Sequence, residues 1–91
     1  MTMKEALITV KGRVQGVFFR ATTQEQALAL GLTGYAKNLD NCDVEILAQG
    51  EDHAINQLIL WAKVGPPRAS VSSLDVTMRE ITQKSDDFTI I

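Results

Sequence analysis

Residues 6–31 read ALITVKGRVQGVFFRATTQEQALALG, and this stretch contains a predicted strand, loop and helix in succession. Residues 6–12 are rich in β-branched side chains and end in a glycine, which is typical of a strand. Residues 13–19 have no regular hydrophobic period, so we expect a loop there that enters the helix. Residues 20–30 are strong or neutral helix formers, and Gly31 supplies a stop signal. A strand followed directly by a helix predicts a layered fold in which the helix covers a sheet.

The rest of the chain predicts a β-hairpin, a second helix and two further strands. Apolar and polar residues alternate in the second hairpin arm, and Gly65, Pro66 and Pro67 end the second helix. The expected ranges are 32–39 and 43–49 for the hairpin, 51–64 for the helix, 70–80 for the next strand and 88–90 for a short final strand. The predicted fold class is therefore α+β: a ferredoxin-like β-α-β-β-α-β sandwich, with an antiparallel sheet and two helices on one face.

The length and composition predict a single small domain over residues 1–91. Hydrophobic residues make up 45% and charged residues 22%, which suits a globular chain and excludes a disordered one. The net charge of −2 argues against a nucleic-acid or anionic-membrane partner. The apolar run 6–10 is too short for a signal peptide or a membrane span, and a lone Cys42 cannot form an internal disulfide. We expect a cytoplasmic monomer without a nucleic-acid or membrane partner.

The loop between the first strand and the first helix has the composition of an anion-binding site. Residues 11–20 contain three cations, Lys11, Arg13 and Arg20, and no acid, although the whole chain is acidic. Two glycines let successive backbone N–H groups converge, and a helix N-terminus favours negative charge. Arg20 adds a planar donor that can bind two phosphate oxygens. The alternative interpretation is a structural turn with solvated arginines, and spacing alone does not separate the two.

Two motifs in the chain resemble the signatures of the acylphosphatase family. Residues 10–20, VKGRVQGVFFR, are similar to the first signature, and residues 34–38, GYAKN, followed by Val44 and Glu45, are similar to the second. The resemblance covers nearly the whole chain. It implies hydrolysis of the carboxyl–phosphate bond of acyl phosphates to a carboxylate and inorganic phosphate, with no metal and no cofactor.

The resemblance also implies which residues carry out the chemistry. Arg20 would bind the phosphoryl oxygens, and Asn38 would orient the attacking water through its side-chain amide. Inorganic phosphate or sulfate would then be a product-like ligand. The backbone N–H groups implied to form the phosphate cradle belong to Gln15, Gly16, Val17, Phe18, Phe19 and Arg20.

One position departs from the family pattern. Cys42 stands in the hairpin turn where the second signature has glycine, and cysteine takes a positive φ less easily than glycine. We expect the neighbouring Asn41 to adopt the left-handed conformation instead. The departure puts the geometry and stability of the turn in question rather than the chemistry at Arg20 and Asn38.

The chain offers few groups for acid–base or metal chemistry. The only histidine, His53, is expected in the first turn of the second helix, and the sequence suggests no paired catalytic carboxylates and no Cys/His nucleophile. A carboxylate leaving group departs without a general acid, so positioning and charge stabilisation suffice for an acyl phosphate but not for an alkyl phosphate monoester. Two alternatives remain open: a ferredoxin-like binding module, and a catalytically weak relative that binds phosphate without turnover.

Overall fold

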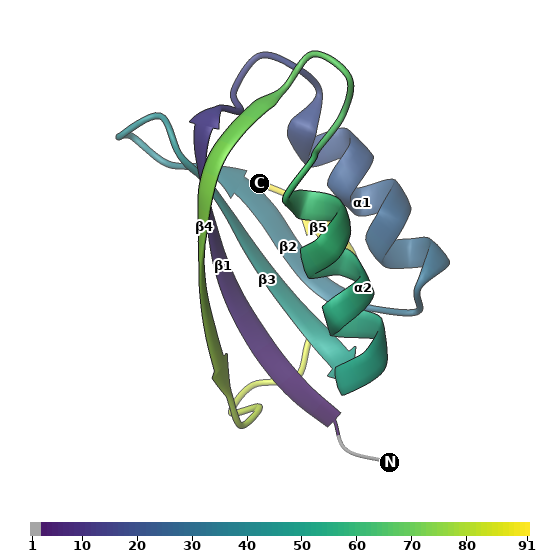
Figure 1. Ribbon diagram of the computed structural model, residues 1–91. Helices are drawn as coiled ribbons and strands as arrows, with labels where there is room; N and C mark the ends of the chain where they lie inside the picture. The colour runs from purple at the N-terminus through teal and green to yellow at the C-terminus, as the bar shows by residue number, and fades with distance from the viewer. Residues whose placement is uncertain (1–2) are drawn as a thin grey trace.

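A computed structural model describes residues 3–91 and shows one sheet with two helices packed on one face (Figure 1). This order and layering confirm the predicted ferredoxin-like α+β fold. The largest difference in range lies at the first strand, which was predicted to begin at residue 6 and begins at Met3. The elements are β1 (Met3–Arg13), α1 (Phe19–Ala29), β2 (Thr33–Asn38), β3 (Val44–Glu51), α2 (Asp52–Ala62), β4 (Ser70–Arg79) and β5 (Phe88–Ile90).

The strands lie in the order β4-β1-β3-β2-β5. The first four pair antiparallel, as predicted, but β5 pairs parallel with β2, so the sheet is mixed. The physical reason lies in the connection. The chain leaves β4 at the foot of the sheet and returns as β5 at the opposite edge, so β5 must run in the same direction as its neighbour β2 (Figure 1). The short final strand is therefore an added edge rather than part of the antiparallel unit.

The core lies between the sheet and the two helices. Helix α1 packs on β2 and β5, while α2 packs on β3 and β1. The predicted alternation in β3 is confirmed, since its inward residues are fully buried, and the predicted apolar face of α2 is buried at three of its four positions. The two helices meet where the Phe19 and Trp61 rings lie 5.4 Å apart. The buried residues of these two faces are Val44, Ile46, Ala48, Ile55, Leu58 and Ala62.

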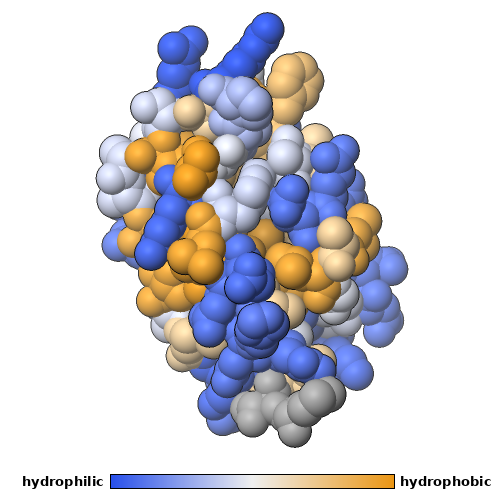
Figure 2. Space-filling model, turned by 45° about the vertical axis from the view of Figure 1, so that its right-hand side comes forward, coloured by the Kyte–Doolittle hydropathy of each residue, from blue (hydrophilic) through white to orange (hydrophobic). Residues whose placement is uncertain are grey.

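Strand β4 forms an edge that no helix covers. Its apolar residues Leu74, Val76 and Met78 pair with buried positions of β1 and so lie on the helix-bearing face. Val76 is nevertheless 39% and Met78 44% exposed, because α2 reaches only as far as β1. On the face seen in Figure 2, the hydrophobic side chains form small separate groups divided by hydrophilic ones. That face presents no continuous apolar surface.

A buried polar network on the open face of the sheet holds the β4–β5 connection in place. The Gln49 amide donates to Glu5 Oε1 at 2.7 Å and to the Gln83 carbonyl at 2.8 Å, and it accepts from the Ser85 N–H at 2.8 Å. Arg79 forms an ion pair with the other Glu5 oxygen. Burial would raise the pKa of Glu5, but the hydrogen bond from Gln49 and the pairing with Arg79 outweigh burial and leave this pKa below its ordinary value.

We expect Glu5→Gln to lower the free energy of unfolding at neutral pH by about 2 kcal/mol, because a charge-assisted bond to Arg79 is lost. Since the folded pKa of Glu5 is lowered, its contribution is present above the unfolded value near 4.5 and is lost as the pH falls through the folded value. Urea unfolding of both proteins from pH 7 to pH 3 measures this. The difference between them should shrink in acid, and a constant difference would contradict the assignment.

The turn between β2 and β3 is closed by backbone bonds and strained at one residue. The Leu39 N–H donates to the Asp43 carbonyl at 2.8 Å, and the Cys42 N–H donates to the Leu39 carbonyl at 3.2 Å. Cys42 itself has a φ of 77°, whereas Asn41 does not have a positive φ. The expectation that Asn41 would take the left-handed position is therefore wrong. The Asn41 side-chain oxygen instead accepts a hydrogen bond from the Asp43 N–H at 3.1 Å, and this bond fixes the position of Asn41 in the turn.

We expect Cys42→Gly to raise the free energy of unfolding by about 0.5–1 kcal/mol. The left-handed conformation costs a non-glycine residue about 1–2 kcal/mol, and the greater freedom of glycine in the unfolded chain offsets part of that gain. Cys42 is exposed, so little packing is lost. Urea unfolding with reductant measures the effect, and Asn41→Gly is the matched control that should destabilise. A loss of stability in Cys42→Gly would show that the φ of 77° carries no strain.

Candidate active site

The loop that joins β1 to α1 turns through two residues with positive φ. Gly16 has a φ of 73°, and Phe18 has a φ of 64° and a ψ of 23°. Glycine reaches this region freely, but a bulky residue held there costs about 1–3 kcal/mol. The Phe18 side chain is 73% exposed, so burial of its ring does not hold the backbone in this conformation, while Val14 and Val17 are buried and anchor the loop. Backbone strain of this kind concentrates at functional sites.

The backbone N–H groups of this loop are available to a ligand. Within residues 3–91, no hydrogen bond is donated by the backbone N–H of residues 15–18. The first N–H groups of α1 have no intrahelical partner by position, and no side chain caps this helix end. Left-handed residues among right-handed ones turn successive N–H groups toward a common point, which is the geometry of an anion-binding nest. The loop and the helix start therefore form one continuous set of donors with a favourable helix dipole.

A bulge at the end of β1 directs the chain into this loop. The pairing of β1 with β4 shifts register between Lys11 and Gly12. Gly12 has a φ of 127°, and a Cβ at this position would collide with the Ser70 carbonyl oxygen. Only glycine fits so close to the neighbouring strand, and the extra residue bends β1 at its end.

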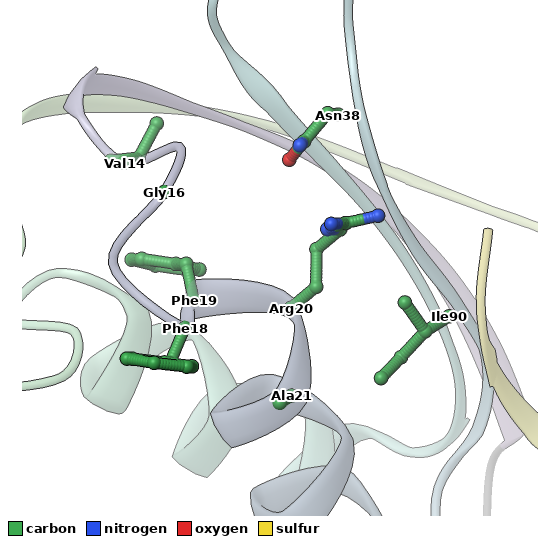
Figure 3. A pocket seen from close by; sticks show the side chains of 8 residues that line it. All are labelled: Val14, Gly16, Phe18, Phe19, Arg20, Ala21, Asn38 and Ile90. Carbon is green, nitrogen blue, oxygen red and sulfur yellow. The ribbon is translucent and has the colours of Figure 1, made fainter.

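Arg20 and Asn38 line the same pocket although they belong to different elements. The pocket has a volume of about 300 Å³ and lies between the β1–α1 loop, the start of α1 and the ends of β2 and β5. Figure 3 shows the Arg20 side chain extending from α1 toward the Asn38 amide, with the loop around Gly16 across the pocket from them. The lining residues are Val14, Gly16, Phe18, Phe19, Arg20, Ala21, Asn38 and Ile90.

The Arg20 guanidinium is held from one side by the end of the chain. Its Nη1 donates to the main-chain oxygen of Ile91 at 2.9 Å. The Ile91 N–H in turn donates to the Ala36 carbonyl of β2 at 3.0 Å. A guanidinium carries five N–H donors, so most of them remain for a bound anion. The bond to Ile91 therefore orients Arg20 without using up its capacity to bind phosphate oxygens.

The side chain of Gln15 has a role that the sequence did not reveal. The sequence predicted only a backbone contribution from this residue, but its Nε2 donates to the Leu39 carbonyl at 2.8 Å and to the Asp43 carbonyl at 2.9 Å. Both partners lie in the β2–β3 turn, far along the chain, and neither is distinctive in sequence. No local signal could have identified this contact.

Other charged groups lie away from the pocket. Of the three loop cations, only Arg20 lines it. The Lys11 ammonium lies 3.9 Å from Asp43 and 3.8 Å from Asp75, and Arg13 is exposed at the end of β1. His53 lies in the first turn of α2, as predicted. None of the residues that line the pocket is a histidine or a carboxylic acid. The pocket thus combines neutral N–H donors, one arginine and one amide.

Two kinds of site can be assessed over the part of the chain that the structure describes. Residues 3–91 contain no cluster of three or more histidine, cysteine, aspartate or glutamate side chains placed to hold a metal ion. None of the helices in these residues has the length and apolar character needed to cross a membrane.

Residues 6–90 match the family model described as acylphosphatase. An acylphosphatase of Halorhodospira halophila is 53% identical over 73 residues, which cover 80% of this chain and 79% of the relative. An acylphosphatase of Methylococcus capsulatus is 39% identical over 89 residues, which cover 98% of this chain and 97% of the relative.

The fold comparison agrees with the sequence comparison. The crystal structure of an acylphosphatase from Bacillus subtilis superposes with a TM-score of 0.94 at 36% identity, covering 97% of this chain and 98% of the other. The two chains are therefore similar in sequence and in fold over nearly their whole length.

Proposed function

This chain belongs to the acylphosphatase family and hydrolyses the carboxyl–phosphate bond of acyl phosphates, and we propose that the pocket of Arg20 and Asn38 is its active site. One observation carries the assignment: an uncapped set of backbone N–H donors, an oriented arginine and a strand-end amide meet in one pocket. The proposal assigns the phosphoryl group to the cradle of residues 15–20 and the attacking water to Asn38.

The phosphoryl group binds with its oxygens toward the backbone donors of the loop. Arg20 adds a planar guanidinium, which can donate two parallel bonds to two of these oxygens. The transition state for phosphoryl transfer is loose, and its charge is spread over the equatorial oxygens. Fixed donors aimed at these oxygens stabilise that charge without reorganising during the reaction.

Asn38 orients the water on the side opposite the leaving group. Its amide oxygen accepts a bond from the water, whose oxygen then bonds to phosphorus while the bond from phosphorus to the acyl oxygen breaks. The electron pair of that bond leaves with the carboxylate, and the proton of the water passes to the phosphate product or to solvent. A carboxylate needs no protonation to depart, so the step balances without a general acid.

Rapid cleavage of benzoyl phosphate, with no cleavage of p-nitrophenyl phosphate above background, is the expected result when both are assayed with a chelator present. The pocket supplies charge stabilisation and positioning but no acidic side chain, which suits the acyl phosphate alone. Equal cleavage of both substrates would contradict the proposed pocket chemistry. Folded protein that binds phosphate but cleaves neither would be the catalytically weak relative that the sequence left open.

Finer properties remain predictions. A monomer, a cytoplasmic location and a single domain over residues 1–91 are supported by the small size, the lone Cys42 and the small net charge of −2. The binding-module alternative has less support, because the acids and bases on the open face of the sheet are paired, Glu5 with Arg79 and Glu45 with Lys37, and do not form a basic surface. Tyr35 on that face donates to Glu45 at 2.7 Å, and burial and this bond raise the pKa of Tyr35 to about 12.

A further inference from the structure

The Gln15 side chain connects the phosphate loop to the β2–β3 turn. Its amide nitrogen donates to the main-chain carbonyls of Leu39 and Asp43 at 2.8 Å and 2.9 Å. A glutamine amide has two N–H donors, so this side chain has spent both of them on the turn. Within residues 3–91, these are the only side-chain hydrogen bonds that join residues 14–18 to the turn.

The two carbonyls belong to turn residues that adjoin Asn38 and its cross-strand partner. Leu39 directly follows Asn38, and Asp43 directly precedes Val44, which is the cross-strand partner of Asn38. Leu39 and Asp43 are themselves joined, since the Leu39 N–H donates to the Asp43 carbonyl at 2.8 Å. A single amide thus holds both arms of the hairpin where Asn38 stands.

Pairing with Val44 holds the Asn38 backbone in the sheet, but little holds its side chain. Asn38 is the last residue of β2 and is exposed, and within residues 3–91 its side-chain amide makes no hydrogen bond. The loop on the other side of the pocket donates no backbone bond from residues 15–18. The relative position of the cradle and the amide therefore depends on the pairing of β1, β3 and β2, on buried side chains of the loop and on Gln15.

We infer that Gln15 is a positioning residue that sets the distance between the phosphate cradle and the Asn38 amide. The inference rests on the proposed function of Asn38. A misplacement of about 1 Å between reacting groups can cost about 10²-fold in rate, so a side-chain link between the phosphate loop and the turn beside Asn38 has a large effect. Gln15 touches neither the substrate nor the water through its side chain and acts through Asn38.

The first test compares Gln15→Met, which keeps the length but removes both donors, with Gln15→Glu, which sets a carboxylate against two carbonyl oxygens. With benzoyl phosphate we expect kcat to fall roughly 10–100-fold in Gln15→Met and further in Gln15→Glu. KM and the inhibition constant of inorganic phosphate should change less than about threefold in Gln15→Met, because the cradle donors remain. Ile55→Val, a core change on α2, is the stability control and should keep kcat.

A double-mutant cycle shows whether Gln15 acts through Asn38. In an Asn38→Ala background, adding Gln15→Met should lower kcat hardly further, since there is no amide left to position. Additive losses would overturn the inference, and so would a fully active Asn38→Ala protein, which would also overturn the proposed role of Asn38. Wild-type activity of Gln15→Met beside an impaired Asn38→Ala would remove the inference alone.

A measurement on the free protein tests the positioning of Asn38 without any assay of activity. The ¹⁵N NMR signals of the Asn38 side-chain amide report its surroundings in the free protein. In Gln15→Met these signals should shift or broaden, whereas in Ile55→Val they should stay as in the wild type. Unchanged Asn38 signals in Gln15→Met would overturn the inference whatever the activities show.

Discussion

Arg20→Ala is expected to lower kcat for benzoyl phosphate by about 10³–10⁵-fold, the range over which an arginine stabilises phosphoryl-transfer charge. Among residues 3–91, Arg20 is the only cation that lines the pocket, and its guanidinium is already oriented by the main-chain oxygen of Ile91. The loss should exceed that of any single cradle donor, because each donor is one of several neutral N–H groups. Stopped or continuous assays of benzoyl phosphate at saturating concentration measure it directly.

Arg20→Lys tests whether the planar shape of the guanidinium contributes to the rate in addition to its positive charge. Lysine keeps a positive charge but cannot offer two coplanar donors, so we expect it to recover only a small part of the lost rate. Arg13→Ala is the matched control, since Arg13 is exposed at the end of β1 and does not line the pocket. Nearly full activity in Arg20→Lys would mean that charge alone matters, and an active Arg20→Ala would refute the assignment.

Local patterns were sufficient to predict the elements of the fold. The alternation of Val44, Ile46 and Ala48 predicted a half-buried strand, and these residues are fully buried. Glycine and proline predicted where elements end, because their backbone preferences act within a few residues. The parallel pairing of β5 with β2 could not be predicted from local patterns, since strand order depends on where a connection crosses the sheet.

The resemblance to a family predicted which site residues to consider, and the fold brings Arg20 and Asn38 to one pocket. Their roles stay predictions until variants are measured. The contact of Gln15 with the turn joins residues far apart in sequence, so no spacing rule could have predicted it. The turn at Cys42 was predicted wrongly because the sequence suggested two candidates for one left-handed position. The bond accepted by Asn41 from the backbone decided between them.

Asn38→Ala is expected to lower kcat by about 10²–10³-fold with a much smaller change in KM, as for the loss of one preorganised polar group. In the proposed role the amide oxygen accepts a bond from the water, so binding of substrate should largely survive the removal of this side chain. Initial rates over a range of benzoyl phosphate concentrations separate the two parameters. A change confined to KM would mean that Asn38 binds substrate and leaves the water to another group.

Asn38→Asp tests the two halves of the amide separately. The aspartate keeps an oxygen that can accept a bond from water, but it replaces the N–H donor with negative charge near the phosphoryl oxygens. Like charges at short range in a partly enclosed pocket repel strongly, so we expect KM to rise here although it holds in Asn38→Ala. If the oxygen alone orients the water, kcat in Asn38→Asp should exceed that in Asn38→Ala at saturating substrate. If kcat is equally low in both, the N–H half of the amide is needed as well, because only the complete amide can donate toward the phosphoryl group while it accepts from the water.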